Sequence, residues 1–550
     1  MPTYATPGVY VEEVPARSKP IEGVSTSTAA FVGIAPGGPV NVPIQISNWS
    51  QFERTFSDPT DTEHRGPFME NAYLAHAVNG FFANGGRLCW VVRVGHGNGQ
   101  PARAVLPADG NPKKVALEVT AQEGVGGQVK VELTIDPPAP RAQLASGNGA
   151  KPADGGAAAA DAPPKDAAGE GKAAGASGDS TPSKPAKTYT VSIHAGREHE
   201  EYAGVLAADL PGLESKFVTL TLGADAAGGE GEEVVPAAGT YNLSVPPIPT
   251  TDVEVLDVEG DVGRRTGLGS LAAVDDISMV CVPDLMAIAG EDSFHLREGQ
   301  GKLIAHCEGM ANRMAILDTP PDLAPSEALD WRLNVAGYDS KQSTLYYPWL
   351  EVMDPLTGFP LLVPPCGHVA GVWARTDSTR GVHKAPANEG ILGITGLAFQ
   401  VTDPEQGDLN RSGLNCIRSF PGRGIRVWGA RTISSDPEWR YINVRRLFIY
   451  VSDSIMLGTQ WAVFEPNDER LWTQLQIAVT NFLTISWRSG ALFGGTPDEA
   501  FYVKCDHETN PPELIEAGQV TTEVGIAPVK PAEFVVFRIS QYTAGENAAA

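Results

Sequence analysis

The fold of this chain is decided by residues 73–94, which read YLAHAVNGFFANGGRLCWVVRV. Apolar side chains recur there at spacings of three and four, which predicts an amphipathic helix over 67–83. The pair Gly85-Gly86 ends that helix, and the apolar run 88–94 is typical of a strand buried on both faces. A helix that leads through glycines into a buried strand indicates a layered α/β core.

The same pattern recurs in the second half of the chain. A helical stretch at 303–310 precedes a strand at 314–318, and two further amphipathic helices are predicted at 441–456 and 468–489. Asn467 is the expected N-cap of the last helix. Short strands are predicted to follow at 501–504, 520–526 and 534–539.

A segment of different composition separates these regions. Residues 136–187 consist almost wholly of Ala, Pro, Gly, Ser, Lys and Asp, which bury too little apolar surface to offset the entropy of ordering, so we interpret them as a disordered linker. Residues 191–261 carry 14 acidic and two basic side chains and are expected to face water. Strands predicted on both sides of the linker indicate an all-β insertion over 100–257; they lie at 115–119, 129–135, 189–193, 217–222 and 241–245.

Composition and charge exclude several classes of protein. The 550 residues are 42% hydrophobic, which excludes disorder throughout, and the net charge of −25 disfavours nucleic acid as a partner because an acidic surface repels phosphates. Six scattered cysteines indicate buried free thiols in a reducing compartment. The sequence shows neither an export signal nor a run of about 18 apolar residues, so we expect a protein made in the cytoplasm without membrane insertion.

A search for catalytic motifs predicts no enzyme. Gly301-Lys302 lacks the Ser or Thr and the spaced glycine of a phosphate-binding loop. The acidic string 198–201 contains His199 and is better explained as a solvated charged face than as an acid–base or metal site. We therefore predict no catalytic residues and no cofactor.

Two close pairs of cysteine and histidine contain the residue types that bind zinc. Cys366 with His368, and Cys505 with His507, would together supply four ligands. Each is a single pair without the spacing that makes a zinc motif specific, so the sequence predicts no metal site.

The two ends of the chain have an unusual pattern. The strand-like run 8–14 is bounded by prolines and has no hairpin partner after it. At the other end, 534–539 is apolar on both faces and therefore requires pairing inside a sheet. Two extended, apolar ends suggest strand addition to a neighbouring subunit.

Several stretches together resemble the sheath protein of contractile bacteriophage tails and phage-tail-like injection systems. They are Thr6-Pro7-Gly8-Val9-Tyr10-Val11-Glu12-Glu13, Ser27 to Gly33, Phe81 to Gly86, Val91 to Val94, Arg265 to Leu268, Val282-Pro283-Asp284, Gly367 to Gly371, Lys384 to Asn388, and the run from Asn443 through Asn467 to Leu492. The resemblance spans about 1–95 and 260–540 and skips the β insertion.

The resemblance implies a mixed α/β fold without enzymatic activity. We expect a layered, subtilisin-like α/β core, an α+β C-terminal domain, a protruding all-β insertion and extended terminal arms. The expected parts are an N-terminal arm 1–20, core segments 21–99 and 258–400, the insertion 100–257 with its linker 136–187, a C-terminal domain 401–530, and a C-terminal arm and tail 531–550.

The resemblance also implies a function and partners. Subunits would stack as hexameric rings in a helical homopolymer around an inner tube protein, with baseplate and terminal cap proteins, and contract without ATP to drive the tube through an envelope. The particle would assemble in the cytoplasm and be released by lysis. The alternatives are a non-contractile shell or fibre and, with less support, a hydrolase with an acidic insertion. The arm residues expected to pair with a sheet of a neighbour's C-terminal domain are Val9, Tyr10, Val11, Phe534, Val536, Phe537 and Ile539.

Overall fold

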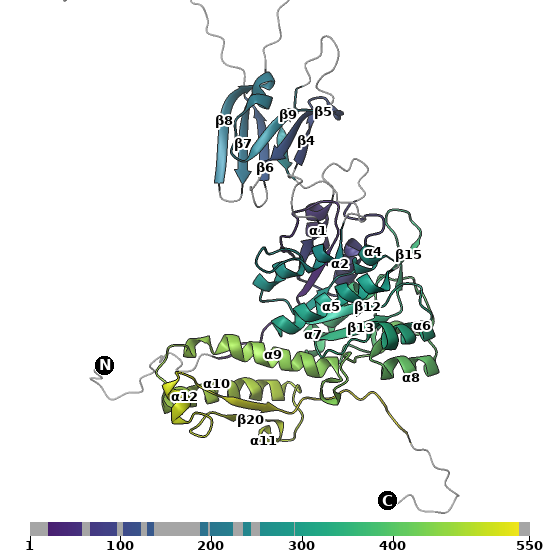
Figure 1. The fold of residues 1–550 in the computed structure, drawn as a ribbon, viewed down its shortest axis with the longest axis vertical. Coiled ribbons are helices and arrows are strands. Elements are labelled where there is room, and N and C mark those ends of the chain that lie inside the picture. The colour runs from purple at the N-terminus through teal and green to yellow at the C-terminus, as the bar shows by residue number, and fades with distance from the viewer. Residues whose placement is uncertain are drawn as a thin grey trace, which may run out of the picture. The chain divides into compact units, whose positions relative to one another are not determined.

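The computed structural model of the protein describes residues 20–57, 66–95, 103–122, 129–136, 187–195, 198–223, 235–243, 253–290 and 292–537. The chain forms two compact units (Figure 1). The first unit contains residues 1–100 and 244–550, and the second contains residues 101–243. Apart from its two end residues, the predicted linker 136–187 lies outside the described ranges.

A nine-stranded sheet forms the centre of the first unit. Its order is β16-β19-β18-β13-β12-β11-β1-β3-β2, and the six strands from β18 to β3 run parallel. The bounds are β1 Ala29–Gly33, β2 Ile44–Ile46, β3 Cys89–Arg93, β11 Met279–Cys281, β12 Met314–Asp318, β13 Ser343–Tyr347, β16 Glu389–Gly390, β18 Leu414–Phe420 and β19 Gly424–Val427. The strands predicted at 88–94 and 314–318 are thus confirmed as β3 and β12.

Apolar side chains cover both faces of this sheet, which is why its central strands read as continuous apolar runs. Phe31 contributes to one core, with α2 and α7, and Val32 contributes to the other, with α4 and α5. The helices of this region are α1 Trp49–Phe56, α2 Leu74–Ala83, α3 Val255–Glu259, α4 Leu285–Ala289, α5 Ser293–Met310, α6 Pro325–Asp330, α7 Cys366–Arg380 and α8 Asp403–Arg411. A small sheet, β15-β14-β17, contains β14 Leu350–Met353, β15 Pro360–Val363 and β17 Gly396–Leu397.

Two glycines allow α2 and α7 to pack closely. A Cβ atom at Gly367 would lie 2.4 Å from backbone atoms of Ala77, and one at Gly371 would lie 2.5 Å from the carbonyl oxygen of Phe81. Any larger side chain at these positions would push the helices apart. This contact explains the two glycines in the stretch 367–371.

The last part of the first unit packs two long helices on a two-stranded antiparallel sheet (Figure 1). Its elements are α9 Ile442–Gly458, α10 Glu469–Arg488, α11 Pro497–Ala500, α12 Pro512–Glu516, β20 Phe501–Lys504 and β21 Glu523–Ile526. The expected N-cap was wrong by one residue: the Asp468 carboxylate accepts hydrogen bonds from the backbone of Arg470 and Leu471. Asn467 instead accepts a hydrogen bond from the indole of Trp472. Although β18 and β19 fall within the predicted C-terminal domain, they belong to the nine-stranded sheet.

The second unit is built from strands around one apolar core. Two sheets share this core, ordered β10-β6-β7-β8 and β4-β5-β9. The strands are β4 Arg103–Ala108, β5 Asn111–Ala121, β6 Val129–Ile135, β7 Thr188–Ala195, β8 Glu198–Leu206, β9 Val218–Leu222 and β10 Gly239–Asn242. Sequence reasoning missed β8, which contains the acidic string 198–201 and forms the edge of its sheet.

Candidate functional site: the two chain ends

The structure describes where each end of the chain meets the first unit. Of the predicted arm residues, Val9, Tyr10, Val11 and Ile539 lie outside the described residues. Phe534, Val536 and Phe537 are described, and none of them belongs to a strand within the chain. The contacts that hold residues 20–28 and 527–533 therefore define the site.

The N-terminal segment is packed into the C-terminal helices. Ile21 is buried in the same core as residues of α9 and α10 and lies against Gly458, where a Cβ would be 2.7 Å from Ile21. Gly23 approaches Tyr450 so closely that a Cβ there would clash with its ring. The backbone N–H of Val24 donates to the hydroxyl of Ser454 at 3.1 Å.

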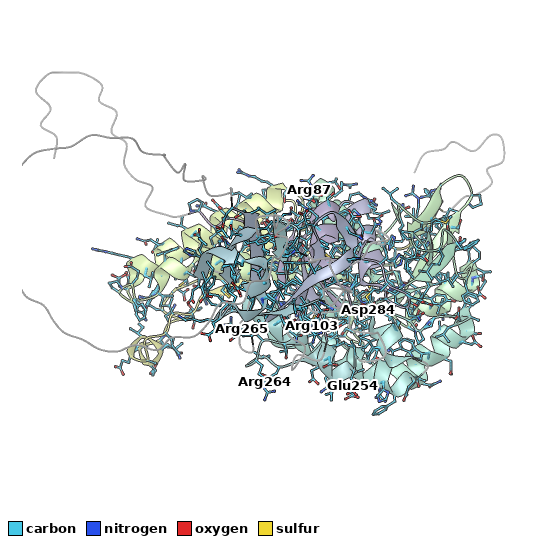
Figure 2. All side chains as sticks on the ribbon, turned by 90° about the horizontal axis from the view of Figure 1, so that it is seen from above. Arg87, Arg103, Glu254, Arg264, Arg265 and Asp284 are labelled. Atoms are coloured by element: carbon cyan, nitrogen blue, oxygen red, sulfur yellow. The ribbon has the colours of Figure 1, made fainter. Side chains whose placement is uncertain are left out.

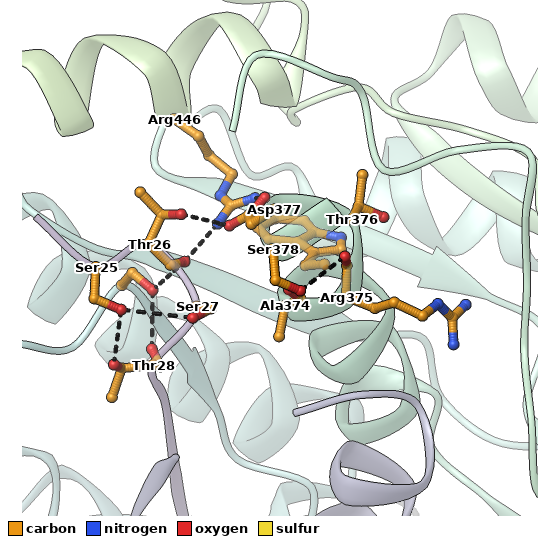
Figure 3. A network of polar contacts seen from close by, with 12 residues as sticks. Ser25, Thr26, Ser27, Thr28, Ala374, Arg375, Thr376, Asp377, Ser378 and Arg446 are labelled. Carbon is orange, nitrogen blue, oxygen red and sulfur yellow. Dashed lines mark hydrogen bonds and ion pairs between the residues drawn. The ribbon is translucent and has the colours of Figure 1, made fainter. Parts of the chain in front are cut away.

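A buried ion pair fixes the next residues (Figure 3). Arg446 of α9 makes two parallel contacts with the Asp377 carboxylate of α7, at 2.8 and 2.5 Å, and both side chains are only 3% exposed. The Arg446 guanidinium also donates to the carbonyl of Thr26 at 2.7 Å, and the Thr26 hydroxyl donates to Asp377 at 2.7 Å. Charge-assisted, two-point contacts of this kind fix geometry strongly.

These contacts place residues 20–28 between two parts of the first unit. The Ser278 hydroxyl contacts the carbonyls of Thr26 and Thr28 at 2.6 and 2.9 Å, and the chain then enters β1 in the central sheet. One short segment thus joins the core of α9 and α10 to the nine-stranded sheet. We call residues 20–28 the N-terminal root.

The C-terminal segment follows the surface of the same helices. After β21, the N–H of Ala527 donates to the carbonyl of Ala500 at 2.8 Å. The side-chain amide of Asn443 then donates to the carbonyl of Val529 at 3.0 Å. We call residues 527–533 the C-terminal root.

An ion pair closes the C-terminal root. Arg431 donates to both carboxylate oxygens of Glu533, at 2.9 and 2.5 Å, and the two side chains are 12% and 17% exposed. Burial by itself raises the pKa of Glu533, but the hydrogen bonds and charge of Arg431 outweigh it, so the pKa lies below its usual value. The pair therefore persists as an ion pair at neutral pH.

Beyond Glu533 the chain is apolar and exposed. Phe534, Val536 and Phe537 are 77%, 79% and 84% exposed. Val535 between them is 69% exposed. Four successive large apolar side chains facing water are unusual on a folded surface, because their burial is favourable by roughly 1.5–3 kcal/mol each. Such a segment fits a partner surface.

The sheet of β20 and β21 has the features of a surface that accepts an added strand. It contains only these two strands among the described residues, so each strand has one edge that no other described strand covers. Unpaired edges of short sheets accept added strands through backbone hydrogen bonds.

The other candidates from the sequence fall elsewhere. Cys366 and His368 are buried on α7 in the central core, whereas Cys505 is buried in a separate core beside α10, so the two pairs do not form one site. Burial lowers the pKa of His368 to about 4, as expected of a neutral core histidine. Across the described ranges, no three His, Cys, Asp or Glu side chains gather as a metal site.

Lys302 has a structural contact of its own. It lies within α5 and pairs with Glu259 at 2.8 Å, rather than following a phosphate-binding loop. All six cysteines are buried and free, which confirms the prediction of buried free thiols. Within the described part of the chain, no helix is both long and apolar enough to cross a membrane.

Asp284 ends the Val282-Pro283-Asp284 motif, and the structure shows what this side chain contacts. This residue, labelled in Figure 2, is fully buried. Its carboxylate accepts hydrogen bonds from the backbone of Ile34, Tyr73 and Leu74, which joins the end of β1 and the starts of α2 and α4. Burial raises the pKa of Asp284 to about 6, against the effect of the three donors. The motif is a fold-stabilising junction.

The comparisons with known proteins agree on one family. A family model described as the phage tail sheath protein central domain matches residues 267–433, and one described as the phage tail sheath C-terminal domain matches 434–541. Together they match half of the chain.

Relatives and solved structures extend this match. The prophage major tail sheath protein of Pseudomonas aeruginosa strain UCBPP-PA14 is 27% identical over 285 residues, covering 50% of this chain and 69% of that protein. The tail sheath protein of Escherichia phage P2 is 25% identical over 345 residues, covering 61% and 80%.

Two solved sheaths match nearly the whole chain in fold. The sheath complex of an extracellular contractile injection system, PVC, in its contracted state has a TM-score of 0.54 and 21% identity, covering 98% of this chain and 99% of that one. The contracted helical sheath of the anti-feeding prophage has a TM-score of 0.54 and 23% identity, covering 98% and 100%. On the family match and these likenesses, the chain belongs to the phage tail sheath protein family.

Proposed function

We propose that this protein is the subunit of a contractile sheath that polymerises helically around an inner tube and contracts to drive the tube through a target envelope. The observation that carries the proposal is that one unit contains both an exposed apolar segment, Phe534 to Phe537, and a two-stranded sheet whose outer edges pair with no other described strand. A donor and an acceptor on one chain generate a heterologous contact, which propagates instead of closing.

The arms would connect neighbours while the lattice rearranges. In this proposal Val9, Tyr10, Val11, Phe534, Val536, Phe537 and Ile539 add strands to the sheet of β20 and β21 in adjacent subunits. Backbone hydrogen bonds supply affinity without demanding a rigid interface. The roots hold each arm at its origin, so a pull on an arm reaches the body of the subunit.

Contraction would use energy stored during assembly. An extended lattice that is metastable by even a few kcal/mol per subunit converts to a shorter, wider one when a baseplate triggers it, and the gain adds over many copies. This account needs neither ATP nor catalysis, and the family consists of structural proteins. We propose that the core is layered and subtilisin-like in fold but has no proteolytic activity. In the assembled particle, subunits would form hexameric rings with the acidic β unit facing outward and a terminal cap at one end. The particle would assemble in the cytoplasm and be released by lysis.

Electron microscopy of the full chain, made alone and with its neighbouring genes, tests this proposal. Hollow helical tubes with two axial repeats, one around a core and one empty, are expected. Tubes of a single repeat would support the static shell, and small discrete particles under both conditions would contradict assembly altogether.

Removal of the arms tests the contact itself. Deletion of residues 1–14, or truncation after Glu533, should abolish tubes while the thermal melt of the monomer stays within a few degrees of the wild type. Truncation after Gln541 removes nine residues but keeps the whole apolar segment and Ile539, and it serves as the control. Tube assembly that survives both deletions would contradict the arm model.

A further inference from the structure

One end of the nine-stranded sheet, next to its edge strand β16, carries cationic and aromatic side chains that the arms do not use. β18 and β19 form an antiparallel hairpin there. We call five side chains on it and just after it the hairpin cluster: Arg418, Phe420, Arg423, Arg426 and Trp428.

The cluster is organised around its two aromatic rings. The ring centroids of Phe420 and Trp428 are 4.5 Å apart. The guanidinium carbon of Arg418 lies 5.2 Å from the Phe420 ring, and that of Arg423 lies 5.6 Å from both rings. Cation–π contacts of this length restrict where the arginines point, so little entropy remains to be lost on binding.

Positive charge is concentrated in the cluster despite an electrostatic cost. The register places Arg418 directly opposite Arg426, and like charges in that position destabilise a sheet. Arg418 is offset by Asp403 at 2.6 Å, but no carboxylate among the described residues pairs with Arg423 or Arg426. Two positive charges therefore remain uncompensated.

Asn388 holds these two arginines in place. Its side-chain oxygen accepts from Arg423 and its carbonyl accepts from Arg426, both at 2.8 Å. Asn388 has a positive φ of 60°, a conformation that asparagine tolerates better than most residues. Both acceptors are neutral, so they orient the guanidinium groups without cancelling their charge.

We propose that the hairpin cluster binds an acidic surface on a second copy of this chain. Arginine and tryptophan are enriched among the residues that dominate protein interfaces, and a preorganised pair of arginines recognises carboxylates. The inference rests on the proposed assembly and adds to it a contact that is independent of the arms.

Charge complementarity identifies the partner surface. The whole chain carries −25, and residues 459–530 contain ten acidic against four basic side chains. On α12, Glu513 and Glu516 are exposed and form no ion pair with a described residue. We assign α12 of a neighbouring copy as the acidic partner, which makes the contact head-to-tail.

Charge reversal in the full-length chain tests this contact. The variant R423E/R426E is compared with R411E/R440E, which changes the net charge equally at two exposed arginines outside the cluster. The measured quantity is the fraction of protein that sediments as assemblies at about 50 and about 500 mM salt. We expect R423E/R426E to weaken assembly roughly tenfold more than the control at low salt, with the difference shrinking at high salt.

A compensating change identifies the partner. Adding E513R/E516R to R423E/R426E should restore assembly, whereas E513R/E516R alone should weaken it. The inference would be overturned if R423E/R426E assembled as well as its control, or if E513R/E516R failed to restore assembly. It would also be overturned if R423E/R426E self-associated normally but no longer copurified with the inner tube. Matching thermal melts exclude misfolding, and tubes in the wild type test the proposed function separately.

Discussion

Both chain ends leave the first unit through an arginine–carboxylate pair, and the two pairs differ in their exposure to water. Arg446 and Asp377 at the N-terminal root are 3% exposed, whereas Arg431 and Glu533 at the C-terminal root are 12% and 17% exposed. The N-terminal root is therefore part of the protein core, whereas the C-terminal root is held to the surface by a partly exposed ion pair.

Burial decides what each pair contributes. Breaking a buried pair leaves one charge without water or partner, while breaking a partly exposed pair allows water to replace the lost contacts. The N-terminal pair also holds Thr26, which stands 351 residues before Asp377 in the chain. We therefore expect loss of the N-terminal pair to unfold the junction, and loss of the C-terminal pair to loosen only the exit of the arm.

The largest effect is expected from Arg446→Ala. It leaves the Asp377 carboxylate buried without its partner, so the free energy of unfolding should fall by about 3–5 kcal/mol. Urea denaturation measures the change. Arg440→Ala, at an exposed arginine of the same region, should stay within about 0.5 kcal/mol of the wild type. A loss below about 1 kcal/mol for Arg446→Ala would show that the buried pair is not critical.

A smaller effect is expected from Arg431→Ala. Water can reach Glu533 once the arginine is gone, so unfolding should become easier by only about 1–2 kcal/mol. Hydrogen exchange of residues 527–533 should rise while that of β1 stays unchanged. A double-mutant cycle with Glu533→Gln isolates the pair. Faster exchange in β1 would mean that the two roots are not independent.

The smallest effect concerns pH. Because the pKa of Glu533 in the folded protein lies below its usual 4.5, the pair stabilises the protein above about pH 4.5, and this contribution is lost as the pH falls through the lower folded value. The stability difference between the wild type and Glu533→Gln should therefore be about 0.5–1 kcal/mol at pH 7 and shrink towards pH 3. A difference that is constant over this range would falsify the conclusion that the ion pair with Arg431 lowers the pKa of Glu533.

Sequence patterns correctly predicted those helices and strands whose apolar side chains recur at a regular spacing. The helix-to-strand pattern of 73–94 corresponds to α2 and β3, and the amphipathic stretches in the last third correspond to α9 and α10. β8 escaped detection because most of its side chains are polar or exposed, so it shows no apolar alternation. Its place comes from backbone pairing with β7, which side-chain patterns do not encode.

The candidate site divides in the same way. The apolar run that begins at Phe534 was evident from the sequence, because a segment apolar on both faces near a chain end must find a partner outside its own hairpin. The root contacts were not evident, since Arg446, Asp377 and Thr26 have no local pattern that marks them as partners. The same holds for Arg431 and Glu533, which stand 102 residues apart.

The sequence by itself determined the family, the α/β pattern of the core, the helices of the last third and the apolar character of both ends, because each depends on residues close together in the chain. The tertiary structure alone decided which charges pair, which glycines allow helices to touch, and where each end leaves the body. Those contacts join residues up to 430 positions apart, and their strength depends on how completely the folded chain excludes water from them.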